Sequence, residues 1–237
     1  YRDAFQEVDQ QSLFEPITKK TWTITQTKRI PEIFREAFRV SMSPRKGPVQ
    51  INIPRDILAK ESNFGNFQKP ENYRLNSIPV ASLETIEKAS QMIFNAKNPV
   101  IIIGGGIKNS EGQSEVLALA EKLNVPIIMS PGHGDAISFS HPLNAGQMGP
   151  RGNVVASRLA KEADVILALG TRLGFNSTFF SYDNININSS IIQVELEPTA
   201  LGRYFPISLG IWGDARQVAS QIYESINKVK FTNEVNQ

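Results

Sequence analysis

The run Pro99-Val100-Ile101-Ile102-Ile103-Gly104-Gly105-Gly106 decides the fold of this chain. Its apolar residues follow one another without polar alternation, which is typical of a strand covered on both faces in a parallel sheet. The glycines that follow allow the backbone to turn sharply where the strand ends. We therefore predict that this run is a strand of a parallel sheet with helices on both faces.

Apolar runs and amphipathic helical segments alternate from here to the end of the chain. Ser82 is the predicted N-cap of the first helix, and Ala215 begins the last. Further strands are predicted at 125–129, 163–170, 190–196 and 207–212, and further helices at 111–123 and 152–161. Right-handed crossovers join such elements into a doubly wound, Rossmann-like α/β domain, which we predict over residues 82–229, with a tail at 230–237.

Residues 1–57 have a different character. A helix is predicted from about Lys28, with Pro31 in its first turn, and 49–54 alternates with period two as a strand does. Since a helix and a strand are too little for a domain, we expect the carboxyl-terminal part of an α/β domain here. The chain lacks an initiator Met, so we expect an excised piece. Residues 58–81, polar and without periodicity, are predicted to be a linker.

The composition excludes several classes of protein. Lys and Arg number 25 against 23 Asp and Glu, and this near balance disfavours a nucleic-acid partner. The absence of cysteine excludes disulfides, thiolate metal sites and cysteine nucleophiles. No apolar run approaches the roughly 18 residues that span a bilayer, and the amino end has no signal-peptide pattern. We expect a cytoplasmic protein that acts on a small molecule and contacts no membrane.

Candidate binding residues follow the predicted strands, because ligands of open parallel sheets bind at the carboxyl ends of the strands. Glycines allow close approach of a phosphate, an arginine can clamp a diphosphate, and a carboxylate can accept hydrogen bonds from ribose hydroxyls. The candidates are Gly104, Gly105, Gly106, Arg172, Glu195 and Asp214. Each has an ordinary alternative role: the glycines as a tight turn, Arg172 in a surface ion pair, Asp214 as a helix N-cap.

Other chemistries lack their motifs. The glycines do not have the G-x-G-x-x-G spacing of a dinucleotide fingerprint, which disfavours a nicotinamide dehydrogenase, and no P-loop is present. The two histidines, His133 and His141, do not have the spacing of zinc ligands. Ser130, His133 and Asp135 crowd one loop without a G-x-S-x-G elbow, so a hydrolase triad is disfavoured.

Strings along essentially the whole chain resemble the thiamine-diphosphate enzymes, in the same order. Those at 4–7, 16–19 and 47–56 are similar to the end of the family's pyrimidine-binding domain, and those at 99–106, 170–172, 194–198 and 213–215 are similar to its middle domain. Within the family, two strings resemble the sulfoacetaldehyde acetyltransferases most, Phe5-Gln6-Glu7-Val8-Asp9-Gln10 and Ile51-Asn52-Ile53-Pro54-Arg55-Asp56.

The resemblance implies thiamine diphosphate and Mg²⁺ as cofactors of a parent enzyme that converts sulfoacetaldehyde and phosphate into acetyl phosphate and sulfite. Acetohydroxyacid (acetolactate) synthase and oxalyl-CoA decarboxylase share the architecture and stay as alternatives. Their middle domains hold FAD and ADP respectively, so the candidates above are the implied nucleotide contacts, unless this branch holds no nucleotide. Gln6 and Lys19 resemble residues that line the active-site approach, where Lys19 would attract an anionic substrate. Family active sites form between subunits, which implies a homodimer or homotetramer.

Residues essential to the thiamine chemistry are expected outside this chain. The resemblance places the glutamate that promotes ylide formation upstream of Tyr1. A G-D-[GA] motif with a later asparagine holds magnesium and the diphosphate, and the chain matches only its first half, at Gly134-Asp135-Ala136 and Gly213-Asp214-Ala215. We therefore predict that the chain alone is inactive. The alternative from another class is a free-standing, non-catalytic nucleotide-binding or regulatory module.

Overall fold

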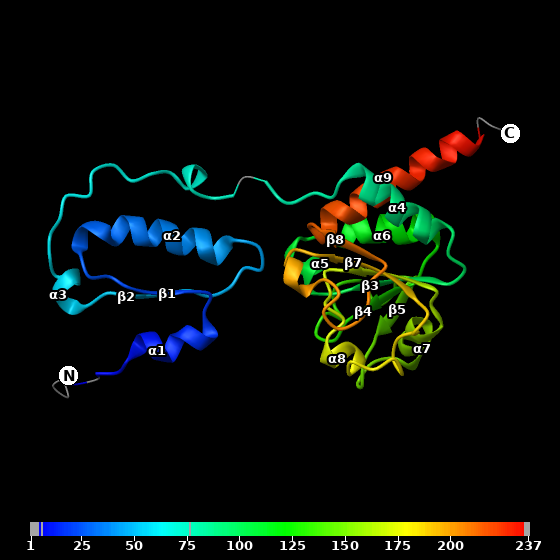
Figure 1. The fold of residues 1–237 in the computed structure, drawn as a ribbon, viewed down its shortest axis with the longest axis horizontal. Coiled ribbons are helices and arrows are strands. Elements are labelled where there is room, and N and C mark those ends of the chain that lie inside the picture. The colour runs from blue at the N-terminus through cyan, green and yellow to red at the C-terminus, as the bar shows by residue number, and fades with distance from the viewer. Residues whose placement is uncertain (1–4, 6, 76, 235–237) are drawn as a thin grey trace. The chain divides into compact units, whose positions relative to one another are not determined.

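The computed structural model describes residues 5, 7–75 and 77–234. The chain separates into two compact units, residues 1–77 and 78–237 (Figure 1). The first unit holds two short strands, and the second holds the large sheet that the glycine-ended run predicts.

The first unit contains a parallel β–α–β arrangement. β1 (Thr21–Thr23) pairs in parallel with β2 (Gln50–Asn52), and α2 (Ile30–Met42) makes the crossover between them. Pro31 stands in the first turn of α2, where its missing N–H costs nothing. A small core forms around Ile24, Ile33 and Ile57. The other elements are α1 (Gln10–Phe14), α3 (Arg55–Leu58) and 3-10 turns at Glu15–Ile17, Thr27–Arg29 and Pro70–Asn72.

The second unit is built on a six-stranded, wholly parallel sheet, which confirms the predicted fold class. Its order is β5-β4-β3-β6-β7-β8. When β3 is numbered as strand 1 and β8 as strand 6, this is the 3-2-1-4-5-6 order of the doubly wound fold. The topological switch point therefore lies between β3 and β6. The strands are β3 (Pro99–Ile103), β4 (Ile127–Met129), β5 (Asn144–Gln147), β6 (Val165–Leu169), β7 (Ser190–Glu195) and β8 (Leu209–Trp212).

Helices cover both faces of this sheet. In Figure 1, α4, α6 and α9 lie over one face, and α7 and α8 lie on the opposite side. Ser82 caps α4 as predicted, since its side chain accepts the N–H of Thr85. The helices are α4 (Leu83–Phe94), α5 (Gly105–Asn109), α6 (Gln113–Leu123), α7 (Val154–Glu162), α8 (Phe175–Thr178) and α9 (Ala215–Glu234), with a 3-10 turn at Pro198–Ala200.

Alternate residues of β3 pack into different cores, which explains its unbroken apolar run. Ile101 and Ile103 belong to the core shared with α4, α6 and α9. Val100 and Ile102 belong to the core on the α7 side. Because both faces are covered, residues 100–103 are all buried and no polar residue interrupts the strand.

Several elements differ from the prediction, since α5 and α8 in the second unit and α1, α3 and β1 in the first were not predicted. β5 was missed because Asn144–Gln147 is not an apolar run; it pairs with β4 through a register shift at the edge of the sheet. α9 runs to Glu234, past the predicted end of the domain at residue 229. Among the described residues, none of the helices is long and apolar enough to cross a membrane.

Candidate functional site

The glycines after β3 lie directly against the end of β6, at the switch point of the sheet. The Gly106 N–H donates to the Gly170 carbonyl at 3.0 Å. A Cβ added to Gly106 would lie 2.5 Å from the Gly170 Cα, and one added to Gly104 would lie 2.6 Å from the Gly170 oxygen. Gly104 and Gly106 are therefore required by the close packing of two backbones, whatever ligand binds beside them.

Gly105 instead faces an imidazole ring from the loop after β4. A Cβ added to Gly105 would lie 3.0 Å from the His133 Cε1 atom. Burial lowers the pKa of His133, and the nearby charge of Lys108 lowers it further against the opposing effect of Asp135. The Lys108 Nζ lies 2.8 Å from both carboxylate oxygens of Asp135. Sequence reasoning did not propose this group as a site, because the group forms only where the ends of β3 and β4 lie side by side.

Arg172 follows β6 and projects outward between two buried neighbours, Thr171 and Leu173. Within the described part of the chain its guanidinium makes no ion pair or hydrogen bond, so the alternative of a surface ion pair is not found there. A guanidinium at this position can bind a phosphate or carboxylate through two parallel hydrogen bonds.

Glu195 and Asp214 lie side by side at the ends of β7 and β8. The Gly213 N–H donates to the Glu195 carbonyl at 3.1 Å, and both carboxylate residues are buried. One Asp214 oxygen accepts the Gln217 N–H at 3.1 Å. This bond is the N-cap of α9, the ordinary role that the sequence also allowed.

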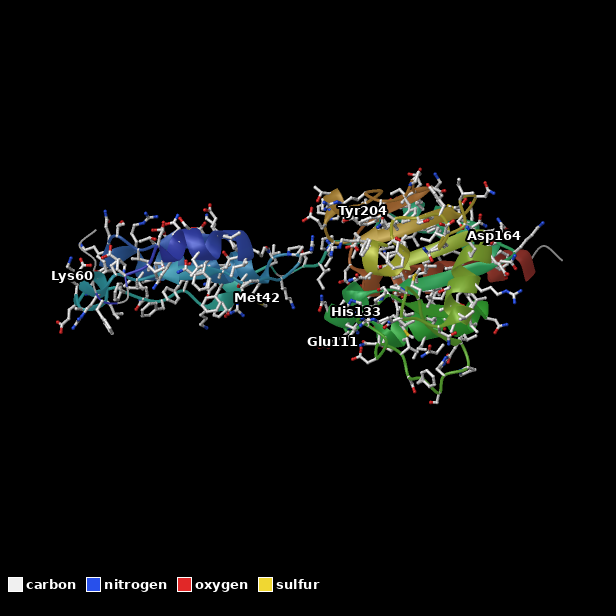
Figure 2. The ribbon with its side chains drawn as sticks, turned by 90° about the horizontal axis from the view of Figure 1, so that it is seen from below. Met42, Lys60, Glu111, His133, Asp164 and Tyr204 are labelled. Carbon is white, nitrogen blue, oxygen red and sulfur yellow. The ribbon has the colours of Figure 1, made fainter. Side chains whose placement is uncertain are left out.

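The structure thus brings the candidates together at the carboxyl ends of the strands of the second unit. The glycines and Arg172 lie at β3 and β6, and the two carboxylates lie at β7 and β8. Figure 2 shows His133 and Tyr204 at this end of the unit. Asp164 lies at the opposite end, where its carboxylate accepts the backbone N–H groups of Lys97 and Asn98.

Lys19 belongs to the first unit, and Gln6 lies outside the described residues. The Lys19 Nζ donates to the Ser43 hydroxyl at 2.6 Å. A Cβ added to Gly47 would lie 3.1 Å from the Lys19 side-chain stem. Lys19 is therefore held across the loop between α2 and β2, with its amino group engaged by Ser43.

The aspartates of the two Gly-Asp-Ala strings are engaged by other parts of the fold. Among residues 5, 7–75 and 77–234, no group of three or more His, Asp or Glu side chains could hold a metal ion. Asp135 pairs with Lys108 at the surface, and Asp214 caps α9, so neither half-motif supplies such a site. We assign no step of thiamine chemistry to these residues.

Comparison with known proteins identifies the family. Residues 86–222 match the model of the central domain of thiamine pyrophosphate enzymes. A probable acetolactate synthase large subunit of Methanococcus aeolicus is 33% identical over 230 residues, which are 96% of this chain and 38% of that protein. A probable sulfoacetaldehyde acetyltransferase of Rhizobium meliloti is 37% identical over 227 residues, 94% of this chain and 37% of that protein.

A sulfoacetaldehyde acetyltransferase of Castellaniella defragrans is 35% identical over 237 residues, 98% of this chain and 38% of that protein. The chain therefore spans about two-fifths of the length of these relatives. The matched central domain coincides with the doubly wound sheet and its helices, from α4 to α9. The chain belongs to the thiamine pyrophosphate enzyme family, whose central domain it carries.

Proposed function

We propose that the chain is part of a thiamine-diphosphate-dependent acyltransferase that converts sulfoacetaldehyde and phosphate into acetyl phosphate and sulfite. The observation that carries this proposal is the similarity, at 35% and 37% identity, to two proteins named for that activity, over nearly the whole chain. Acetolactate synthase is the second candidate, because relatives with that name match at 33% over a similar span.

The experiment compares substrates on the complete enzyme that contains this chain, supplied with thiamine diphosphate and Mg²⁺. Sulfite released from sulfoacetaldehyde in the presence of phosphate supports the acetyltransferase. Acetolactate formed from pyruvate, without sulfite release, would assign the second candidate instead. Absence of both activities in the complete enzyme would favour a non-catalytic nucleotide-binding module. We propose that this enzyme is a homodimer or homotetramer in the cytoplasm.

Residues 1–237 alone are proposed to be inactive. The supporting observations are the missing group of metal ligands in the described residues and the partial coverage of the relatives. The purified chain, incubated with thiamine diphosphate, Mg²⁺, sulfoacetaldehyde and phosphate, is expected to release no sulfite. Turnover by this chain would overturn the proposal.

We further propose that the carboxyl edge of the sheet binds a nucleotide diphosphate, ADP or FAD. The position at the switch point of a doubly wound sheet supports this, because that is where such sheets bind ligands. The exposed Arg172 supplies a cation, and Glu195 and Asp214 supply carboxylates two and three strands from the glycine turn. Calorimetric titration with ADP, FAD and NAD tests it; no heat and no rise in melting temperature with any of them would reject the site.

A further inference from the structure

The connection between β6 and β7 displays aromatic rings on a backbone held in an unfavourable conformation. Leu173, Phe179 and Phe180 have φ values of 51°, 51° and 55°. Only six non-glycine residues of the described chain have positive φ, and half of them fall in this short segment. Bulky side chains rarely adopt this conformation, because Cβ crowds the carbonyl oxygen. The fold thus maintains a costly backbone here.

Buried groups hold this segment in place. Leu173 and Ile185 anchor its two ends in the core on the α7 side. Thr178 is fully buried; its hydroxyl donates to the Leu173 carbonyl at 3.0 Å and accepts the Phe180 N–H at 3.1 Å. Gln193 of β7 donates to the Thr171 carbonyl at 3.2 Å. Core contacts and hydrogen bonds therefore hold the connection at both ends and in its middle.

The rings on the outer side of this connection are not buried by the fold. Phe175, Phe179 and Phe180 are 54%, 43% and 49% exposed. Phe175 lies at the centre, with ring centroids 5.0 Å from Phe179 and 5.6 Å from Phe180. Phe180 in turn lies 4.5 Å from Tyr204, in the loop before β8. Gln193 joins that loop to the same framework, since its side-chain oxygen accepts the Gly202 N–H at 2.8 Å.

The chemistry of the segment favours an anionic ligand with a planar ring. Between Thr171 and Tyr182 the sequence has one charged residue, Arg172, and no carboxylate. Exposed aromatic faces stack on planar rings, and an exposed guanidinium pairs with phosphate. Both features follow β6 directly, at the switch point where the nucleotide is proposed to bind.

We propose that Phe175, Phe179 and Phe180 form a stacking platform for the planar ring of the nucleotide, with Arg172 binding its phosphate. This inference rests on the proposed nucleotide site and adds the residues that contact the ring. The platform explains why the fold holds exposed rings on a left-handed backbone: the geometry is fixed before the ligand arrives, so little conformational entropy is lost on binding.

The test uses four probes on the purified chain: FAD and ADP, which have a ring and a diphosphate, riboflavin, which has only the ring, and pyrophosphate, which has no ring. Phe175→Leu removes the central ring. It is expected to weaken the binding of FAD, ADP and riboflavin about tenfold, which is the scale of one lost stacking contact. Pyrophosphate binding is expected to stay unchanged. Phe175→Tyr, which restores a ring, should recover the affinity, and Phe179→Leu provides a second substitution in the platform.

Phe139→Leu is the matched control, because Phe139 is exposed in the separate loop between β4 and β5. If the chain binds FAD and ADP but Phe175→Leu and Phe139→Leu bind them equally, the platform is rejected and the nucleotide site stands. If wild type binds none of the probes, both proposals fall. If Phe175→Leu instead changes the oligomeric state with unaltered FAD affinity, the rings serve a protein interface and the platform is likewise rejected.

Discussion

The contact between Gly106 and Gly170 can be tested by adding one methyl group. In Gly106→Ala the new Cβ would lie 2.5 Å from the Gly170 Cα and 3.1 Å from the Gly170 oxygen. Since carbon atoms pack at about 3.5 Å or more, the α5 turn and the end of β6 must separate by about 1 Å. No rotamer change can relieve this contact, because the atoms that clash belong to the Gly170 backbone.

The cost has three parts. Overpacking of a tight contact costs about 1–3 kcal/mol. The Gly106–Gly170 hydrogen bond, now 3.0 Å long, would be stretched out of range, which costs about 1 kcal/mol more. Replacing glycine by alanine within a helix returns up to about 1 kcal/mol. We therefore expect Gly106→Ala to lower the free energy of unfolding of the second unit by about 1–4 kcal/mol.

Urea unfolding followed by tryptophan fluorescence can measure this loss. The chain has two tryptophans, and Trp22 lies in the first unit while Trp212 lies in the second. A Trp22→Phe background leaves Trp212 as the reporter of the sheet. With a slope of about 2 kcal/mol per molar urea, the midpoint should fall by about 1 M.

Gly174→Ala is the matched control. Its Cβ would lie 3.8 Å from the Tyr204 ring, an ordinary contact, and its φ of −76° suits any residue. We expect its free energy of unfolding to stay within about 0.5 kcal/mol of that of wild type. Gly170→Ala should be at least as destabilising as Gly106→Ala, because it meets the same contact at a φ of +60°. Equal midpoints for Gly106→Ala and Gly174→Ala would refute this reasoning.

Three further predictions concern hydrogen bonds from backbone N–H groups to side chains. Asp164→Ala removes the acceptor of the Lys97 and Asn98 N–H groups and should cost about 2 kcal/mol in urea unfolding; an unchanged midpoint contradicts it. Burial raises the pKa of Asp164, but these N–H donors outweigh burial and the net pKa is lowered, so its stabilisation is lost as pH falls below about 4. Wild type should therefore lose more stability than Asp164→Ala between pH 5 and the acid range, and parallel pH profiles would exclude this role. Thr178→Val leaves the Phe180 N–H without its acceptor and should cost about 1–3 kcal/mol, checked by thermal melting against Ser140→Ala at the surface.

The sequence predicted the elements whose residues are buried on both sides or capped by a local bond. β3 and β6 are continuous apolar runs because both faces of the sheet are covered. α4 begins where Ser82 predicts, because its hydroxyl bonds an N–H only three residues away. Each of these signals lies within one short stretch of sequence, so it can be recognised without knowledge of the tertiary contacts.

What the sequence could not predict depends on contacts between distant segments. β5 has glycine, alanine and polar residues, and only its pairing with β4 makes it a strand. The ring of His133 over Gly105, and the Gly106–Gly170 contact, arise because the β3 end lies between the ends of β4 and β6. The motif at 104–106 predicted a ligand turn, but the spacing alone could not reveal that two of its glycines serve packing.

The positions of the candidates also limit the shape of a ligand. From the glycine turn after β3 to Asp214 after β8 there are three strand intervals, across β6 and β7. At about 4.8 Å per interval, this distance is about 14 Å. A compact anion bound at the glycine turn could not also reach Asp214, whereas an elongated molecule with a phosphate near Arg172 and hydroxyls near the carboxylates could contact both. For the proposed site, this spacing therefore fits an elongated nucleotide better than inorganic phosphate.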